Sequence, residues 1–206
     1  MRTAVLGIGA SLCLVSASAL AEGNRYDQPR LYHSEVSVSE AFLIAKNGNA
    51  NGKASKRPVL LDVRSIPEYV SGHPEGALHV PYPRIHDTLD PILSAEEKAA
   101  LLVEAVTAAV PDKDTPILVL CKTGSRSIAA SNLLAQAGYT QVRNVWEGFE
   151  GRTKTDTAGN ELDLNNNGVV GDEGDLDGWK NFAGLPYSTK LNPQLIYRPF
   201  DYLYHL

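Results

Sequence analysis

A single cysteine with two cations close behind it is the feature of this sequence most able to do chemistry. Cys121 ends the apolar run TPILVLC and precedes KTGSRS, which carries Lys122 and Arg126. Backbone N–H groups turned around the sulfur, the dipole of a following helix and two positive charges would all favour thiolate over thiol. Such a thiolate is a nucleophile with a pocket for an anion. The alternative, a buried apolar cysteine, would require neither the glycine of this loop nor the cations.

The length of the loop separates two chemistries that use a cysteine and an arginine in this way. Phosphoryl transfer needs a wide cradle for a bulky group, whereas the transfer of one sulfur atom needs a tighter one. The loop from Cys121 to Arg126 has the form C-x4-R, one residue shorter than the C-x5-R loop of cysteine phosphatases. The shorter loop favours sulfur. The candidate substrate-binding residues of the loop are Lys122, Thr123, Gly124, Ser125, Arg126 and Ser127.

The N-terminal residues indicate where the protein works. Residues 1–21 have an early Arg2, an apolar stretch and a small-residue ending, ALA, which is typical of a secretory signal peptide cut before Glu22. An uncleaved membrane anchor is the alternative, disfavoured by the many Ala, Ser and Gly residues. Cleavage removes Cys13, so the mature chain 22–206 has one thiol and no internal disulfide to form. We therefore expect a periplasmic or secreted protein with no membrane attachment.

The remaining sequence alternates strands with helices and predicts an α/β fold. Capping boxes at Ser37 and Ser94 open two of the predicted helices. Helices are expected at 37–48, 93–111 and 125–138, and strands at 57–64, 76–82, 115–121 and 140–146. This alternation implies a mostly parallel central sheet with helices on both faces. The formal net charge of −5 argues against a nucleic-acid surface, which would need a basic stripe.

Several motifs in order resemble the rhodanese family of sulfurtransferases. LLDVRSIPEYVSGHPEGALHVPY at 60–82 is similar to the family's first signature, and LCKTGSRS to its active-site loop, followed by a helix that ends in AGY. NVWEGFEG and GWKNFAGLPYS resemble its C-terminal end, split by an insert. The resemblance implies a three-layer, rhodanese-like single domain over 22–206. It also implies that Cys121 takes a sulfur from a thiosulfate-like anionic donor, holds it as a persulfide and passes it to a thiol or cyanide, without a cofactor.

The resemblance leaves some roles open. Asp62 and Arg64 are expected to position the substrate pocket; an Arg64–Glu68 ion pair that holds the first signature together is an equal alternative. His73 and His79 belong to structural parts of the family pattern, which disfavours a Cys/His hydrolase. Two alternatives to the sulfurtransferase stay open. One is a sulfur-carrier module with little turnover, and the other is a cysteine phosphatase or arsenate reductase-like enzyme.

Two segments lie outside this pattern. The acidic insert at about 151–178 contains DLNNNGVVGDEGD, which begins like a calcium-binding EF-hand loop but has Gly174 at the twelfth position. A structural calcium ion held by Asp163, Asn165, Asn167, Val169, Asp172 and Asp175 is one prediction, and a solvated acidic loop is the other. The aromatic segment 191–206 is expected to pack on the domain, the alternative being a partner-binding tail.

Overall fold

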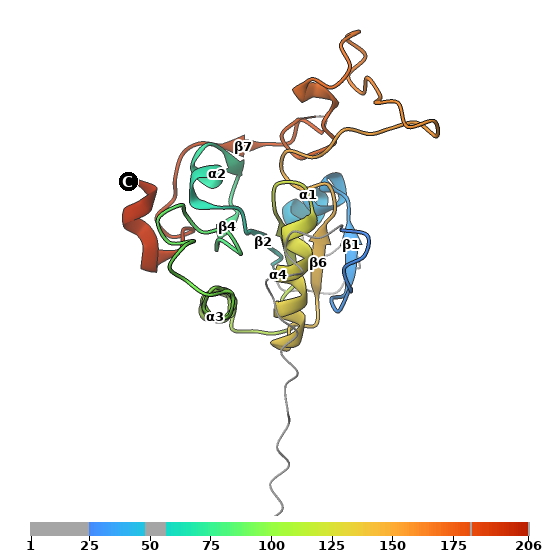
Figure 1. The fold of residues 1–206 in the computed structure, drawn as a ribbon. Helices are drawn as coiled ribbons and strands as arrows, with labels where there is room; N and C mark the ends of the chain where they lie inside the picture. Colours follow the sequence, from blue (N-terminus) through green and yellow to red (C-terminus); the bar gives the residue numbers. More distant parts are fainter. Residues whose placement is uncertain (1–24, 48–56, 182, 206) are drawn as a thin grey trace, which may run out of the picture.

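A five-stranded parallel sheet forms the centre of the protein (Figure 1). A computed structural model describes residues 25–47, 57–181 and 183–205. The strand order is β1-β6-β5-β2-β4, and every neighbouring pair is parallel. The strands are β1 (Ser34–Val36), β2 (Val59–Asp62), β4 (Leu78–His79), β5 (Ile117–Leu120) and β6 (Val142–Val145). The predicted α/β class with a parallel central sheet is confirmed.

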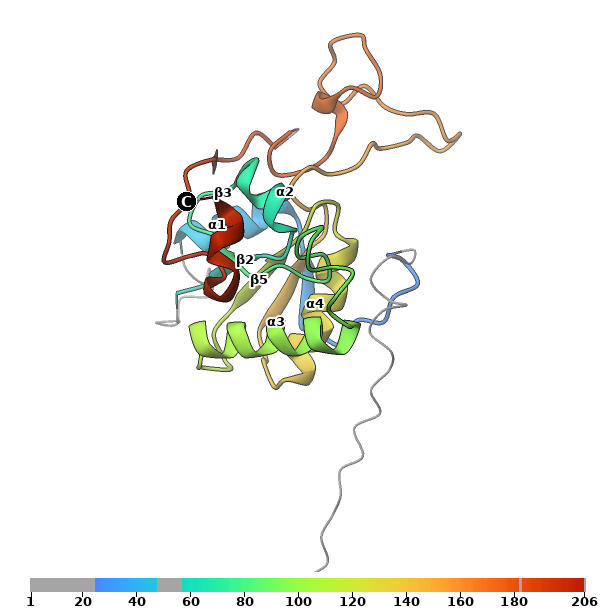
Figure 2. The same ribbon diagram turned by 60° about the vertical axis from the view of Figure 1, so that its left-hand side comes forward.

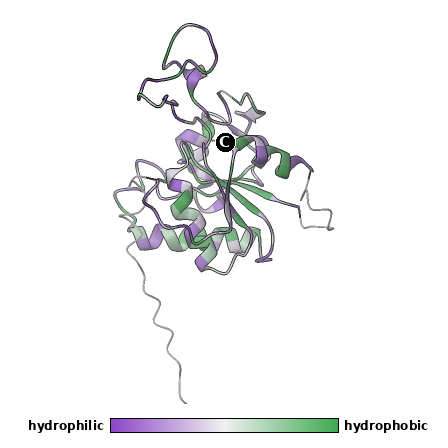
Figure 3. Cartoon of the chain, turned by 90° about the vertical axis from the view of Figure 1, so that its right-hand side faces the viewer, coloured by the Kyte–Doolittle hydropathy of each residue, from purple (hydrophilic) through white to green (hydrophobic). Residues whose placement is uncertain are grey.

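Helices cover both faces of this sheet, as the alternation of elements predicted. α1 (Val38–Asn47) packs on one face, and α3 (Ala95–Ala109) and α4 (Ser125–Gln136) pack on the other (Figure 2). Ile117 and Val119 of β5 share a core cluster with α3 and α4, while Leu118 and Leu120 share a cluster with α1. All four side chains are fully buried. A continuous apolar run is the sequence that a strand covered on both faces requires, and Figure 3 shows the hydrophobic strands at the centre.

The local signals placed the helices well and the short elements poorly. Ser94 accepts a hydrogen bond from the N–H of Glu97 at the start of α3, as its capping box predicts. The strands expected at 57–64 and 76–82 are shorter than predicted. The polar residues after β2 form a short helix, α2 (Ile66–Val70), instead of a simple strand end. β3 (His73–Pro74) and β7 (Tyr187–Ser188) form a separate antiparallel pair that no pattern predicted.

The two segments outside the family pattern behave differently. The C-terminal segment packs on the domain as expected, with Ile196, Tyr197 and Tyr204 buried, and ends in the 3-10 helix η2 (Arg198–Tyr204). The insert instead extends away from the sheet (Figures 1 and 2). It contains one isolated bridge, Thr155 to Glu161, and the short 3-10 helix η1 (Glu173–Asp175).

The predicted signal peptide, 1–21, lies outside the described residues. Within the three described ranges, no helix has the length and apolar character needed to cross a membrane.

Candidate active site

Cys121 lies directly after β5, in the turn that leads into α4. Its side chain is only 1% exposed. Gly124 is the N-cap of α4 and has φ +86°, a left-handed conformation that glycine adopts without strain. A Cβ on Gly124 would lie 1.9 Å from the carbonyl oxygen of Trp146, so no other residue fits there without moving backbone. The glycine therefore allows the turn to pass tightly between the sulfur and the end of β6.

Two neutral donors point at the sulfur of Cys121. The N–H of Gly124 donates at 3.2 Å, and the hydroxyl of Ser127 donates at 3.3 Å. Ser127 is fully buried on the first turn of α4, whose N-terminus also directs the positive end of the helix dipole to this place. Both hydrogen bonds and the dipole stabilise a negative charge on the sulfur. This cradle provides what a nucleophilic thiolate, or an anion built on it, requires.

The two loop cations are each paired with a carboxylate. The guanidinium of Arg126 donates to both oxygens of Glu68, at 2.8 Å each, and Lys122 Nζ lies 3.1 Å from Glu150 Oε2. Burial alone would raise the pKa of Glu68, but the hydrogen bonds and charge of Arg126, with the bonds from Ser65, hold it at about 2. Burial would likewise lower the pKa of Arg126, and Glu68 and the charge of Cys121 outweigh it. Arg126 is therefore close enough to feel the sulfur, but its charge is largely compensated.

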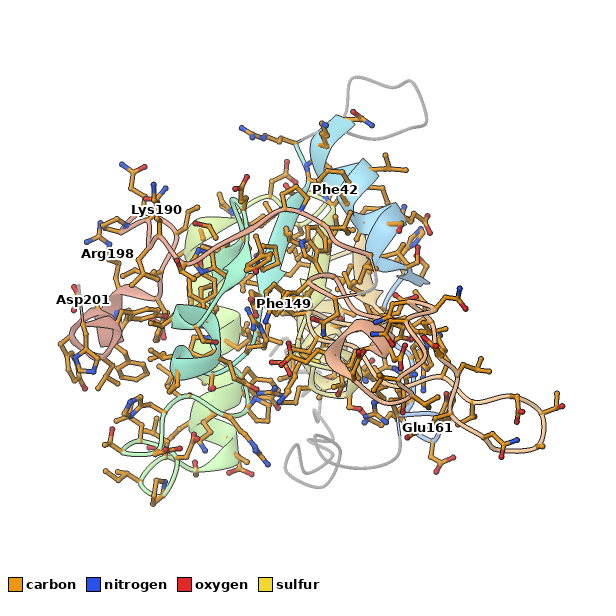
Figure 4. All side chains as sticks on the ribbon, turned by 90° about the horizontal axis from the view of Figure 1, so that it is seen from above. Phe42, Phe149, Glu161, Lys190, Arg198 and Asp201 are labelled. Atoms are coloured by element: carbon orange, nitrogen blue, oxygen red, sulfur yellow. The ribbon has the colours of Figure 1, made fainter. Side chains whose placement is uncertain are left out.

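Asp62 and Arg64 form a buried ion pair at the end of β2. Arg64 Nη2 lies 2.7 Å from Asp62 Oδ2, and both side chains are at most 1% exposed. Arg64 also donates to the carbonyl oxygens of Glu68 and Gly72, and its guanidinium lies 3.9 Å from the ring centre of Phe149, near the centre of the molecule (Figure 4). The alternative of an Arg64–Glu68 ion pair is wrong. Arg64 holds only the backbone of Glu68, whose carboxylate belongs to Arg126.

The histidines of the first signature belong to a buried aromatic stack. The ring of Tyr69 lies between those of His73 and His79, with centroids 3.9 and 4.0 Å away. His79 bonds to the carbonyl oxygen of Arg64 and to the hydroxyl of Tyr204 on the C-terminal segment. Burial is the main influence on His79 and lowers its pKa to about 4, so the ring is neutral near pH 7. In the part of the chain that is described, the donors to the sulfur are Gly124 and Ser127, not a histidine.

Comparison with known proteins agrees with this geometry. A family model described as Rhodanese-like domain matches residues 46–154, more than half of the chain. The chain belongs to the rhodanese-like family. Thiosulfate sulfurtransferase 18 of Arabidopsis thaliana is 33% identical over 114 residues, which are 55% of this chain and 74% of that protein. Thiosulfate sulfurtransferase PspE of Escherichia coli K12 is 30% identical over 85 residues, 41% of this chain and 65% of that protein.

A solved structure extends the likeness to more of the chain. The crystal structure of Rv0390 from M. tuberculosis is 24% identical, with a TM-score of 0.47, and the match covers 77% of this chain and 99% of that one. The family resemblance inferred from the sequence is thus confirmed by the family model, which spans the first signature and the Cys121 loop of the rhodanese-like chain.

Three further residues contact the rhodanese-like loop although no sequence motif pointed to them. Arg25 is buried, donates to the carbonyl oxygens of Thr123 and Trp146 at 3.1 and 3.0 Å, and stacks 4.0 Å above the ring of Trp146. Arg152 donates to the hydroxyls of Ser125 and Thr123 at 2.9 and 3.4 Å. Glu150 pairs with Lys122. Only the position of Glu150 and Arg152, at the end of the NVWEGFEG motif, could have drawn attention to them.

The acidic insert uses its side chains to hold its own backbone. Asp163 accepts from the N–H groups of Asn167 and Gly168, and the fully buried Asp175 accepts from those of Leu164, Asn165 and Gly171. Asp172 accepts from the side-chain amides of Asn165 and Asn167. Across the described ranges, no three Asp, Glu, His or Cys side chains form a group that could hold a metal ion. Val169, whose carbonyl was the other predicted ligand, is exposed.

Proposed function

We propose that this protein is a sulfurtransferase that carries sulfur on Cys121 as a persulfide. The observation that supports it most is the cradle of two donors, Gly124 N–H and Ser127 O–H, aimed at one sulfur at the start of α4. Membership of the rhodanese-like family and similarity to proteins named thiosulfate sulfurtransferases support the same reaction class.

The proposed cycle has two displacement steps at sulfur. The Cys121 thiolate attacks the outer sulfur of thiosulfate, the S–S bond of the donor breaks, and sulfite leaves with the electron pair. The product is a Cys121 persulfide, whose charge the donors of Gly124 and Ser127 stabilise. A thiolate or cyanide then attacks the outer sulfur, the new S–S bond breaks, and the Cys121 thiolate returns. No oxidant, reductant or cofactor is needed for this balance.

The remaining residues of the site would act by positioning. Arg64, anchored on Asp62, holds the backbone of Glu68, and Glu68 fixes the guanidinium of Arg126 beside the sulfur. This chain of contacts would keep the loop at the size that suits one sulfur atom. A wider loop, as in C-x5-R enzymes, would be needed for a phosphate group.

The test is sulfur transfer from thiosulfate to cyanide by residues 22–206 and by the Cys121→Ser variant. We expect activity in the first and none in the second, with a mass increase of one sulfur on Cys121 after thiosulfate alone. Persulfide without turnover would favour the sulfur-carrier alternative. Hydrolysis of an aryl phosphate without any persulfide would instead favour the phosphatase alternative.

Export and calcium binding stay predictions from the sequence. The segment 1–21 supports a periplasmic or secreted location, and N-terminal sequencing of the exported chain should begin at Glu22. A calcium ion would have to use oxygens of Asp163, Asp172 and Asp175 that already accept hydrogen bonds. Binding would raise the Tm of the wild type in millimolar CaCl2, more than MgCl2 does, and not that of Asp163→Asn. An unchanged wild-type Tm would contradict it.

A further inference from the structure

The cations around Cys121 are not free to attract an anion. Each of the three that the sequence assigned to substrate binding or pocket formation has a carboxylate partner within 3.1 Å. The pairs are Arg126–Glu68, Lys122–Glu150 and Arg64–Asp62. The buried Arg25 contacts two backbone carbonyl oxygens. A dianionic donor that approaches a protein of net charge −5 therefore needs another positive group at the mouth of the loop.

Arg152 has the properties that the other cations lack. Its side chain is exposed, and its guanidinium donates to two neutral hydroxyls, Ser125 Oγ at 2.9 Å and Thr123 Oγ1 at 3.4 Å. Among the ion pairs of the described residues, none joins Arg152 to a carboxylate. Neutral partners leave its charge uncompensated. Its two contacts lie on either side of Gly124, whose N–H donates to the sulfur of Cys121.

The base of the insert holds the backbone of Arg152 in place. Its N–H donates to Asp177 Oδ1 at 2.7 Å, and its carbonyl oxygen accepts from the N–H of Asp177 at 3.1 Å. Asp177 is buried, and its second carboxylate oxygen lies 2.8 Å from Lys154 Nζ. The neighbouring Lys154 is thus neutralised, and Arg152 is not. The two ends of the insert meet at this point, so the insert fixes an uncompensated guanidinium at the edge of the Cys121 loop.

We propose that Arg152 binds the anionic end of the sulfur donor and selects donors by their charge. This inference rests on the proposed sulfurtransferase function. A guanidinium matches the oxygens of a sulfonate-like group with paired N–H donors, and it can exchange its neutral hydroxyl partners for a charged one at little cost. Arg152 would bind the leaving-group end of the donor while Cys121 attacks the outer sulfur.

The experiment compares wild type, Arg152→Gln and Arg152→Lys with two donors, the dianion thiosulfate and a monoanionic arenethiosulfonate. We expect Arg152→Gln to raise the KM for thiosulfate about tenfold or more, the loss typical of one charge-assisted hydrogen bond. The KM for the arenethiosulfonate should rise less, and kcat should change little. Arg152→Lys should recover most of the loss. The fall of kcat/KM for thiosulfate with added salt should be shallower in Arg152→Gln than in the wild type.

The matched control is Lys190→Gln, which removes the same charge on the other side of the molecule (Figure 4). An unchanged KM in an active Arg152→Gln, or an equal loss of kcat with both donors, would overturn the assignment. Calorimetric titration of thiosulfate into Cys121→Ser, with and without Arg152→Gln, measures donor binding without turnover. A wild type that lacks Cys121-dependent transfer would fail the proposed function, whereas equal affinities in this titration would fail only the role of Arg152.

Discussion

Alanine substitutions at two glycines of α4 test how tightly the active-site loop is built. Gly124 precedes the helix with φ +86°, and Gly138 follows it with φ +92°. A Cβ at Gly124 would lie 1.9 Å from the carbonyl oxygen of Trp146, whereas a Cβ at Gly138 has nothing within 4 Å. The two variants share the strain of a left-handed alanine and the change in unfolded-state entropy. Their difference therefore isolates the steric conflict at the loop.

The expected magnitudes follow from these contacts. Gly138→Ala should cost about 1–2 kcal/mol, the penalty of a left-handed non-glycine residue. Gly124→Ala should add about 1–3 kcal/mol, because the backbone must shift to relieve the overlap. That shift also moves the N–H that donates to Cys121 at 3.2 Å. Loss of one such donor lowers kcat by about 100-fold in comparable oxyanion sites.

Urea unfolding gives the two free energies, and the thiosulfate–cyanide assay gives the two rates. We expect Gly138→Ala to retain the wild-type rate. Equal destabilisation by the two substitutions would refute the reasoning, because it would mean that the loop can move away from Trp146 freely. A slow but fully stable Gly124→Ala would also contradict it, since the same displacement is held responsible for both effects.

Three further predictions concern residues that support the loop. Arg64→Met should destabilise the fold by about 3–5 kcal/mol in urea unfolding, because it leaves the buried carboxylate of Asp62 unpaired, and Asp62→Asn in the same chain should recover part of this loss. Arg25→Met should lower the Tm and the rate together, since it removes the donors to the carbonyl oxygens of Thr123 and Trp146; an unchanged rate would show that the loop does not need them. Lowering the pH from about 6.5 to about 4 should reduce the Tm, because the unfolded chain takes up a proton that buried His79 does not; a flat profile over this range would contradict a neutral His79.

The sequence was most informative where short-range rules decide the structure. β5 is apolar at every position because both faces are covered, and the glycine and cations after it marked the loop. The capping box of α3 and the order of the family motifs gave the remaining framework. The same rules missed α2, because a five-residue helix beginning at Ile66 with Pro67 near its start has too few turns to show a period.

The contacts that compensate the charges of the site were beyond this reading. Glu68 reaches Arg126 across 58 positions, and Arg25 reaches Thr123 across 98. Neither pairing has a local signature, because each depends on how separate elements dock. The sequence therefore identified Lys122 and Arg126 as cations near Cys121 correctly in position, but it could not show that each has its own carboxylate.

The two kinds of electrostatic support around Cys121 have different consequences for the reaction. Gly124 N–H, Ser127 O–H and the start of α4 act at hydrogen-bond distance in a buried place, so salt screens them little. The compensated pair Arg126–Glu68 fixes geometry more than it supplies net charge. Stabilisation of the attacking sulfur is thus assigned to neutral donors, and recognition of the donor's charge to the exposed Arg152. Because these tasks lie on different residues, substitution of Arg152 should change donor preference without removing the nucleophile's support. Loss of the Gly124 donor should slow every donor alike.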